Sequence, residues 1–397
     1  MRGIKLGLLP KLLIAIAAGI VIGLYGPLWF CRAIVTASGA FSSFLKFIIP
    51  LMILAFVTMG IAGLSHGAGG LLLVTAAMSY GSTLIAGSLS FLVSSRLFPM
   101  FVTSAAQQKL QGVAEAALQP YFSLSIPPLL DTLSAVTLAF IVGLCLSTLR
   151  GKGKGGTLYD CFQDFSLIIE MVLSSVIVPL LPLYICGTFV DMTRSGETFA
   201  VMSVLWKVFL VVIIMHLCFI VLQFFAAGAV SGKNPLRLIA NQVEGYMAAL
   251  GTQSSAATIP VNLRCAEKDG ISREIRDFVV PLCANIHLSG SMITITACAT
   301  AVCLMNQLPL DFGTVVHFIM TLGFAMVAAP GAPGGAVLTA LPFMPLIFGP
   351  EAGDPNGPLC ALMVALYVTQ DSFGTACNVS GDNALGVIVD TLYKKRG

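Results

Sequence analysis

Residues 370–383 read QDSFGTACNVSGDN, and this stretch places two acids inside a long apolar segment near the end of the chain. Asp371, Thr375, Asn378 and Asp382 follow one another at intervals of four, three and four residues. At 3.6 residues per helical turn, this spacing puts the four side chains on one face of a helix. A carboxylate facing lipid at mid-depth costs several kcal/mol, so we predict that this face contacts protein, water or cations.

The composition of the whole chain makes lipid the expected surroundings. Of the 397 residues, 57% are hydrophobic and only 10% are charged, whereas soluble domains carry about 25% charged residues. The deficit extends along nearly the whole length and predicts an all-α polytopic membrane protein. The formal net charge of +3 is too small to indicate a nucleic-acid partner. Arg2 and Lys5 precede the first apolar run, which we interpret as a membrane span and not as a signal peptide.

Eight segments are long enough to cross a bilayer, which requires about 20 residues. Six come first, at residues 7–26, 37–64, 70–98, 124–149, 164–191 and 199–228. The other two are 273–306, which polar residues interrupt from Asn285 to Ser291, and 358–393, which contains the stripe of acids.

Two further segments have short apolar arms around a tip, which favours re-entrant helical hairpins over spanning helices. The first is 234–265, with the polar tip GTQSS at 251–255, and the second is 312–352, with the tip APGAPGG at 329–335. The order hairpin, helix, hairpin, helix indicates a duplicated unit, and interrupted segments at matching positions point to a transporter site. Because basic residues favour the cytoplasm, their distribution predicts cytoplasmic termini and hairpins that enter from opposite sides, as inverted repeats.

The polar groups of these elements suit a charged small molecule and a cation. Asp371 would bind an ammonium group, and Asn378 with Asp382 would bind a hard cation. Free N–H groups at the first tip carry partial positive charge and suit a substrate carboxylate, while the second tip offers backbone carbonyls. The alternatives are a structural hydrogen-bond network for the acids and plain solvated loops for the tips.

Four pieces of sequence together resemble the dicarboxylate/amino acid:cation symporter family: SSAATIP at 254–260, HLSGS at 287–291, the Pro/Gly-rich second tip, and QDSFGTACNVSGD. The family includes the glutamate transporters and the bacterial serine/threonine symporters, and the motifs look most like the latter branch. The resemblance covers 234–393, and 37–98 more loosely. It implies a homotrimer with an elevator mechanism. The scaffold would be 1–66 and 99–191, and the moving transport domain would be 67–98 and 192–397.

The resemblance also implies roles for individual residues. Asp371 would bind the substrate ammonium group, Asn378 would bind the substrate through its amide, Asp382 would bind a cation, and the backbone of Ser255 would meet the substrate carboxylate. The full substrate set is Ser254, Ser255, Ala332, Gly334, Asp371, Thr375 and Asn378. The full set for Na⁺ is Asp382, Asn378, Cys283, His287, Met326 and Ala329.

Two departures from the family pattern concern the substrate. Members that carry acidic substrates have an arginine where this chain has Gly374, and some have one at the first hairpin tip, where this chain has Gln253. A second substrate carboxylate buried without a cation would be costly. Gly374 and Gln253 are therefore the expected specificity-determining positions, and they favour a neutral substrate.

Another departure concerns the coupling ion. The family's NMDGT motif falls on HLSGS, so that its asparagine becomes His287 and its aspartate becomes Ser289. Tyr80 and Thr83 match two other ligands of the same inner Na⁺ site, but their neighbour is Leu84. We expect this inner site to be lost, which leaves one or two Na⁺ ions. His287 is a candidate proton site, because an imidazole titrates near neutral pH; the alternative is a neutral packing histidine.

The sequence therefore predicts a Na⁺-driven symporter, not an enzyme, for a small neutral amino acid such as serine, threonine or alanine. It would lie in a bacterial-type cytoplasmic membrane, in contact with lipids. The alternatives with the same fold are coupling to H⁺ through His287, or transport of another small organic anion such as a dicarboxylate. A channel is less favoured because the polarity is concentrated at two tips and two helices. A hydrolase is less favoured because HExxH does not occur and because Ser255, His287 and Asp371 are better explained as substrate and cation contacts than as a catalytic triad.

Overall fold

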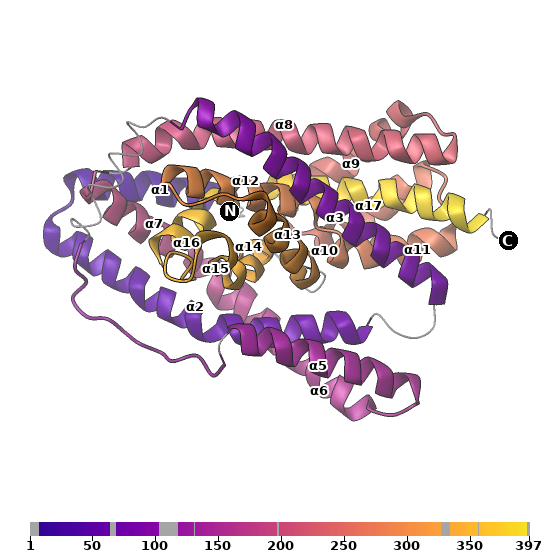
Figure 1. The fold of residues 1–397 in the computed structure, drawn as a ribbon, viewed down its shortest axis with the longest axis horizontal. Coiled ribbons are helices and arrows are strands. Elements are labelled where there is room, and N and C mark those ends of the chain that lie inside the picture. The colour runs from indigo at the N-terminus through magenta and orange to yellow at the C-terminus, as the bar shows by residue number, and fades with distance from the viewer. Residues whose placement is uncertain are drawn as a thin grey trace, which may run out of the picture.

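The computed structural model describes residues 8–63, 69–102, 118–130, 132–196, 198–326, 334–355 and 357–394. These residues are mostly helical and contain no strand, and 118–130 form an irregular connection. The first eight helices labelled in Figure 1 are α1 (Leu8–Tyr25), α2 (Leu28–Gly63), α3 (Gly69–Leu97), α5 (Thr132–Gly151), α6 (Gly156–Val172), α7 (Val178–Arg194), α8 (Thr198–Ser231) and α9 (Pro235–Thr252). The remaining ones are α10 (Ser255–Lys268), α11 (Arg273–Ile286), α12 (Ser289–Met305), α13 (Phe312–Met326), α14 (Gly335–Ala340), α15 (Pro345–Phe348), α16 (Pro358–Val368) and α17 (Asp371–Lys394).

Several of these helices have the length and apolar composition of membrane spans. In the described part of the chain, five segments qualify: Leu28–Phe56, Leu71–Met100, Gly156–Arg194, Leu205–Ser231 and Arg273–Met305. Shorter apolar helices occur at Ile14–Tyr25, Thr137–Gly151, Phe312–Met326 and Leu359–Val368. The chain is therefore an integral membrane protein, as predicted. The count of eight spanning helices stays a prediction.

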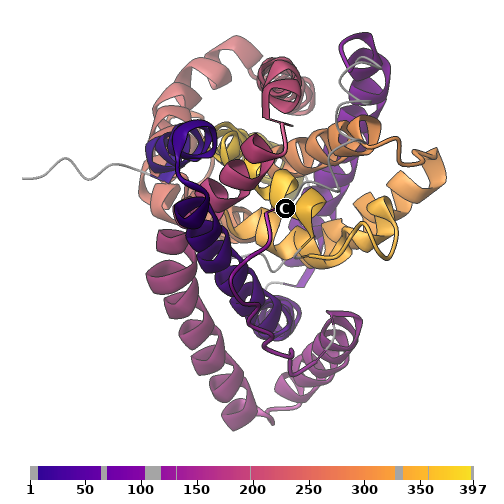
Figure 2. The ribbon, with the colours of Figure 1, turned by 90° about the vertical axis from the view of Figure 1, so that its left-hand side faces the viewer.

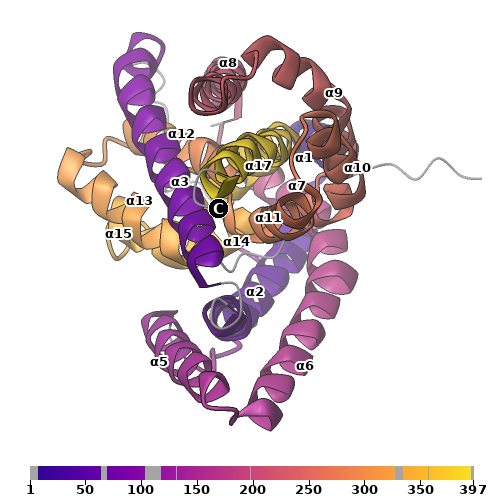
Figure 3. The same cartoon turned by 90° about the vertical axis from the view of Figure 1, so that its right-hand side faces the viewer.

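One group of helices is built around α17. Figure 3 shows α17 in the middle, with α3, α8, α9, α10 and α11 around it. The α17 helix packs against α8, α9, α10, α11 and α12, and nearly all of its side chains are buried. A helix buried on every side can carry polar groups only if other elements satisfy them, so the neighbours of α17 determine its chemistry.

A second group consists of α1, α2, α5, α6 and α7. The α2 helix packs against α5, α6 and α7, and α1 lies against α7 (Figure 2). The close approach of α1 to α7 requires glycine, because a Cβ atom at Gly19 would lie 2.7 Å from the carbonyl oxygen of Cys186. The two groups meet where α16 lies against α7 and where α14 lies against α2.

Three helical elements around α17 are interrupted. The α9 and α10 helices pack together as a hairpin, as predicted for 234–265. The second helix of the hairpin continues past the predicted segment to Lys268. The α11 and α12 helices are separated at His287 and Leu288, within the predicted interruption. Unlike the continuous segment suggested by the sequence, 358–393 is divided into α16 and α17. The backbone N–H of Gln370 donates to the carbonyl of Tyr367, and its side-chain Nε2 atom donates to the carbonyl of Leu366 at 3.0 Å. These two hydrogen bonds satisfy carbonyl groups at the end of α16.

Candidate substrate and cation site

The predicted stripe of polar side chains lies along α17 and faces protein. Asp371 is the first residue of α17, and Asp382 lies eleven residues further, or about 16 Å along the axis. The exposed fractions of Asp371, Thr375, Asn378 and Asp382 are 4%, 5%, 2% and 0%. Because these side chains are buried, their partners must come from the elements packed against α17.

Asp371 is held by two donors from different elements. Its Oδ2 atom accepts a hydrogen bond from the backbone N–H of Gly334 at 2.7 Å, and its Oδ1 atom accepts one from the hydroxyl of Tyr367 at 2.8 Å. Gly334 precedes α14, and Tyr367 belongs to the last turn of α16. No lysine or arginine in the described part of the chain forms an ion pair with this carboxylate. Its negative charge is thus available to a cationic ligand.

Asn378 joins α17 to the interruption before α12. Its Oδ1 atom accepts from the backbone N–H groups of Gly290 at 2.7 Å and Ser291 at 3.3 Å, and its Nδ2 atom donates to the Ser291 hydroxyl at 3.0 Å. The helices touch here, since a Cβ atom at Gly290 would lie 2.3 Å from the carbonyl oxygen of Gly374. In this conformation the side-chain amide of Asn378 binds the backbone of the first turn of α12, directly after the interruption.

Asp382 and His287 form a buried pair. The Nδ1 atom of His287 lies 3.0 Å from Oδ1 of Asp382, and both side chains have an exposed fraction of 1% or less. An ionised Asp382 carboxylate can only accept, so in that state Nδ1 carries the hydrogen. Nε2 of the same ring lies 3.0 Å from the Ser82 hydroxyl and 3.4 Å from the amide nitrogen of Gln223. The ring fits because residue 381 is glycine, whose Cβ would otherwise lie 2.5 Å from Cε1 of His287.

The tip of the first hairpin is tied to the start of α17. Gln253 has a left-handed backbone conformation with φ of 54°, and its Nε2 atom donates to the Ser372 hydroxyl at 2.8 Å. Ser254 caps α10 by accepting from the N–H of Ala257 at 3.3 Å. Ser255 begins α10 and is buried. The structure thus ties Gln253 to Ser372, the chain neighbour of Asp371, and Ser254 and Ser255 follow Gln253 directly in the chain.

The second hairpin contributes backbone to the site. Met326 is buried at the end of α13, and Gly334, with φ of 75°, donates its N–H to Asp371. Ala329 and Ala332, together with the rest of the tip at 327–333, lie outside the described residues.

The residues that match the inner Na⁺ site have other partners. Tyr80 donates its hydroxyl hydrogen to the carbonyl of Met320 at 3.2 Å, and Thr83 donates to the carbonyl of Ser79 at 2.9 Å. Cys283 is buried, with its sulfur 3.5 Å from the Ser79 hydroxyl. The carboxylate that the family places in this site is absent, since position 289 is serine. The loss of the inner Na⁺ site stays a prediction.

Asp382 does fit a cation. Its Oδ2 atom is buried and has no hydrogen-bond partner in the described part of the chain, while Oδ1 faces His287. A buried unpaired carboxylate oxygen is costly, and a hard cation with oxygen ligands would satisfy it. No three His, Cys, Asp or Glu side chains within the described ranges form a cluster able to hold a metal ion.

Several functional contacts were missed by sequence reasoning. Tyr367 lies four residues before Asp371, a spacing that could have suggested its role across the helix break. Ser82 and Gln223, by contrast, reach His287 from α3 and α8 and carry no sequence signal that links them. His216 is another: its Nε2 atom lies 3.0 Å from the carbonyl oxygen of Gly290 and 3.1 Å from the Thr294 hydroxyl, behind the interruption.

Helical interruptions that converge on a buried acid-bearing helix define a membrane transporter site. The chain belongs to the sodium:dicarboxylate symporter family, whose pattern it matches over residues 8–392. Members of this family are transporters and not enzymes. The resemblance deduced from the motifs is thereby confirmed.

The chain is also similar to individual members of known name, at sequence identities of 26% to 28%. The chain is 28% identical to excitatory amino acid transporter 2 of Homo sapiens over 264 residues, which are 64% of this chain and 44% of that protein. It is 26% identical to excitatory amino acid transporter 1 of Mus musculus over 270 residues, 66% and 48% of the two chains. It is 28% identical to neutral amino acid transporter B(0) of Bos taurus over 264 residues, 64% and 46%. The matched region spans about half the length of these relatives.

Proposed function

We propose that the protein is a Na⁺-coupled symporter for a small neutral amino acid of the serine, threonine or alanine type. Asp371 carries the assignment. It is a buried carboxylate without a basic partner in the described residues, and its two hydrogen bonds come from Gly334 and Tyr367. A substrate ammonium group would supply the missing positive charge. The backbone N–H groups at the start of α10, beginning with Ser255, would receive the substrate carboxylate.

The neutrality of the substrate is supported by what surrounds Asp371. Gly374 lies one turn further along α17, and a Cβ atom there would meet only the Thr294 hydroxyl at 3.4 Å and the backbone of Gly290. Gln253, at the hairpin tip, donates a hydrogen bond from its side-chain amide nitrogen to the Ser372 hydroxyl. Neither position offers a cation to a second substrate carboxylate. Thr375 and Asn378 complete the substrate set on the same face of α17.

Asp382 would bind the principal Na⁺ ion, and the carbonyl groups of the second hairpin would bind another. We therefore propose one or two coupled Na⁺ ions, with no inner third site. The His287–Asp382 contact favours one alternative, in which His287 carries a proton in place of a Na⁺ ion. A small dicarboxylate substrate is the other alternative, and it would need a cation that Gly374 and Gln253 do not provide.

The proposed mechanism is an elevator. The group built around α17 would be the transport domain, and the group of α1, α2, α5, α6 and α7 would be the scaffold of a homotrimer. The first hairpin would be the cytoplasmic gate and the second the outer gate. The contacts of α16 with α7 and of α14 with α2 support this division, since they are the surfaces that would slide.

The test is uptake into proteoliposomes under separate Na⁺ and pH gradients. Na⁺-dependent serine uptake that disappears in Asp371→Asn, with assembly unchanged, is the expected result. Uptake that follows the pH gradient and ignores Na⁺ would replace Na⁺ by H⁺. Unchanged serine affinity in Asp371→Asn would refute the ammonium assignment.

A further inference from the structure

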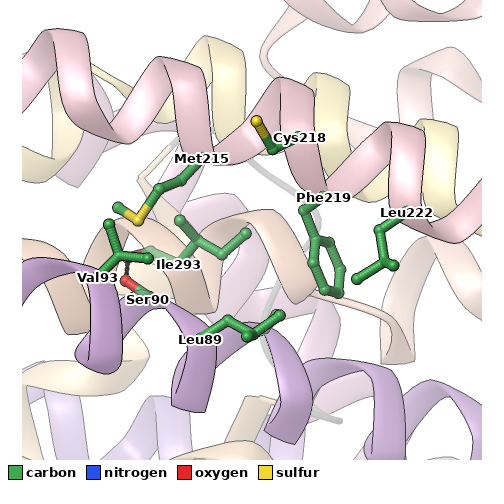
Figure 4. A pocket seen from close by; sticks show the side chains of 9 residues that line it. Leu89, Ser90, Val93, Met215, Cys218, Phe219, Leu222 and Ile293 are labelled. Carbon is green, nitrogen blue, oxygen red and sulfur yellow. Dashed lines mark hydrogen bonds between the residues drawn. The ribbon is translucent and has the colours of Figure 1, made fainter.

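A groove separates α3 and α8 on the side of the molecule away from α5 and α6. Both helices pack against α12, and the groove lies between them (Figure 4). Its volume is about 200 Å³. The lining residues are Ala86, Leu89, Ser90 and Val93 from α3, Met215, Cys218, Phe219 and Leu222 from α8, and Ile293 from α12.

The α3 residues form one wall of the groove and the α8 residues form the other, and the lining residues have the same sequence spacing in both walls. On each helix the lining residues follow at i, i+3, i+4 and i+7, which is one continuous helical face. Such faces normally interdigitate when two helices pack together. Here they face each other across a gap, because α12 holds the helices apart and small residues, Ala86 and Ser90, lie on the α3 wall.

Water is a poor occupant of this groove. A buried water needs two to four polar partners. The only lining hydroxyl is that of Ser90, which donates to the carbonyl of Ile293 at 2.7 Å and is buried. An empty gap would forfeit the dispersion contacts of both walls. For scale, an engineered apolar cavity of about 150 Å³ in another protein binds benzene. The groove is therefore suited to apolar atoms.

The depth of the groove in the membrane identifies those atoms. The α3 wall lies inside the span Leu71–Met100, and the α8 wall lies inside the span Leu205–Ser231. Each wall is at least about 10 Å from either end of its span along the helix axis. Lipid head groups do not reach this depth, whereas acyl chains fill it.

The groove also has an opening toward lipid. Leu89 and Leu222 are 39% and 50% exposed, and Cys218 is exposed. Met215, Phe219 and Ile293 lie behind them, with exposed fractions of 9%, 4% and 2%. Lipid that only surrounds the protein would touch the first set of side chains and not the second.

We propose that the groove is a binding site for one acyl chain of a membrane phospholipid, inserted between α3 and α8 against Ile293. The chain would contribute packing that the protein itself does not supply. Because Ile293 lies in the second turn of α12, after the interruption at His287 and Leu288, an inserted chain would brace the helix that carries Gly290 and Ser291. The proposal does not depend on the identity of the transported substrate.

The experiment uses the full chain in bilayer nanodiscs that contain a small fraction of a phospholipid with a diazirine near the middle of one acyl chain. After irradiation, adducts are mapped by peptide mass spectrometry. We expect adducts on the recessed residues Met215, Phe219 and Ile293. A second phospholipid with the diazirine next to the head group should not label them, and this comparison needs no protein variant.

Two variants fill the groove from opposite walls, Ala86→Phe and Cys218→Phe. Their matched controls are the adjacent lipid-facing positions, Ile85→Phe and Leu217→Phe, which are 55% and 48% exposed in the native chain and do not line the groove. We expect a several-fold loss of recessed adducts in the filling variants only, with adducts on exposed α8 residues retained.

Several results would overturn the proposal. They are recessed adducts that persist in both filling variants and adducts confined to exposed residues such as Leu217. Labelling of the recessed residues by a free diazirine fatty acid but not by the phospholipid would also reject a phospholipid as the occupant.

Discussion

The Nδ1 atom of His287 lies 3.0 Å from Oδ1 of Asp382, and the other oxygen of this buried carboxylate has no hydrogen-bond partner among the described residues. His287 thereby occupies one side of the acid. We propose that the other side binds a cation and that the imidazole limits how Asp382 coordinates it. On this proposal, the ion requirement of the protein depends on position 287.

We expect His287→Ala to lower the thermal midpoint in Na⁺-free buffer, because an unpaired buried acceptor costs about 1–3 kcal/mol. Na⁺ should then raise the midpoint more than in the native protein, since both oxygens of Asp382 become available. Ser82→Ala is the control, because it removes the contact to Nε2 and the hydrogen bond from Gln223 but leaves the contact between Nδ1 and Asp382 in place. Equal Na⁺-dependent shifts in His287→Ala and the native chain would show that His287 does not restrict the acid.

Tyr367→Phe should weaken amino-acid binding without preventing folding. The substitution removes the hydroxyl that holds Oδ1 of Asp371 at 2.8 Å. A hydrogen bond to a charged group contributes about 1.5–3 kcal/mol, so we expect a rise in Kd on the order of tenfold. Tyr246→Phe, at a half-buried position beside Ala249, is the matched control. Calorimetric titration would distinguish them, and an unchanged Kd for Tyr367→Phe would remove Tyr367 from the site.

Gly374→Arg should shift preference toward aspartate or glutamate, because it would supply the cation that a second carboxylate requires. A Cβ atom is tolerated at Gly374, where its nearest contact is 3.4 Å, but not at Gly290, where it would be 2.3 Å. Gly374→Ala should therefore fold and keep the neutral preference, whereas Gly290→Ala should lose stability through overpacking. Competition of unlabelled amino acids with serine uptake measures the preference. An unaltered ranking in a folded Gly374→Arg variant would argue against this position as a determinant of specificity.

The contact between Gln253 and Ser372 can be measured with a double-mutant cycle. Gln253→Ala and Ser372→Ala each remove the same 2.8 Å hydrogen bond, so their effects on serine binding should not add. We expect a coupling free energy of about 0.5–1.5 kcal/mol. Strictly additive losses would mean that the hairpin tip is positioned without this bond.

Asp269, in the loop after α10, should give the stability a pH dependence. Burial raises its pKa from 3.8 to about 6, against the opposing effects of Asn241 and Lys233. An acid with a higher pKa in the folded state binds more protons when folded, so stability should fall as the pH rises from about 4 to about 6. Asp269→Asn should flatten this fall in the thermal midpoint, whereas the exposed Glu351→Gln should not. A slope that Asp269→Asn leaves intact would assign it to other groups.

The sequence predicted those features that depend on periodicity within one segment. The four-residue stripe of α17 follows from helical spacing, and the hairpin of α9 and α10 follows from two arms too short to span. The division of 358–393 into two helices was not predictable in this way, because it depends on the hydrogen bond from the Gln370 side chain to the carbonyl of Leu366. The partners of His287 were also hidden, since Ser82 and Asp382 are 205 and 95 residues away along the chain. The family followed from motifs, whereas substrate and ion coupling stay predictions.

The contact from Gly334 to Asp371 is made by a peptide N–H group and not by a side chain. Substitutions that alter only side-chain chemistry at this position leave the donor in place, although non-glycine residues would be strained at φ of 75°. Proline alone removes the donor. In a saturation-mutagenesis screen, position 334 should therefore rank residues by backbone conformation and be nearly indifferent to charge or polarity. The same screen at position 371 should rank them by charge.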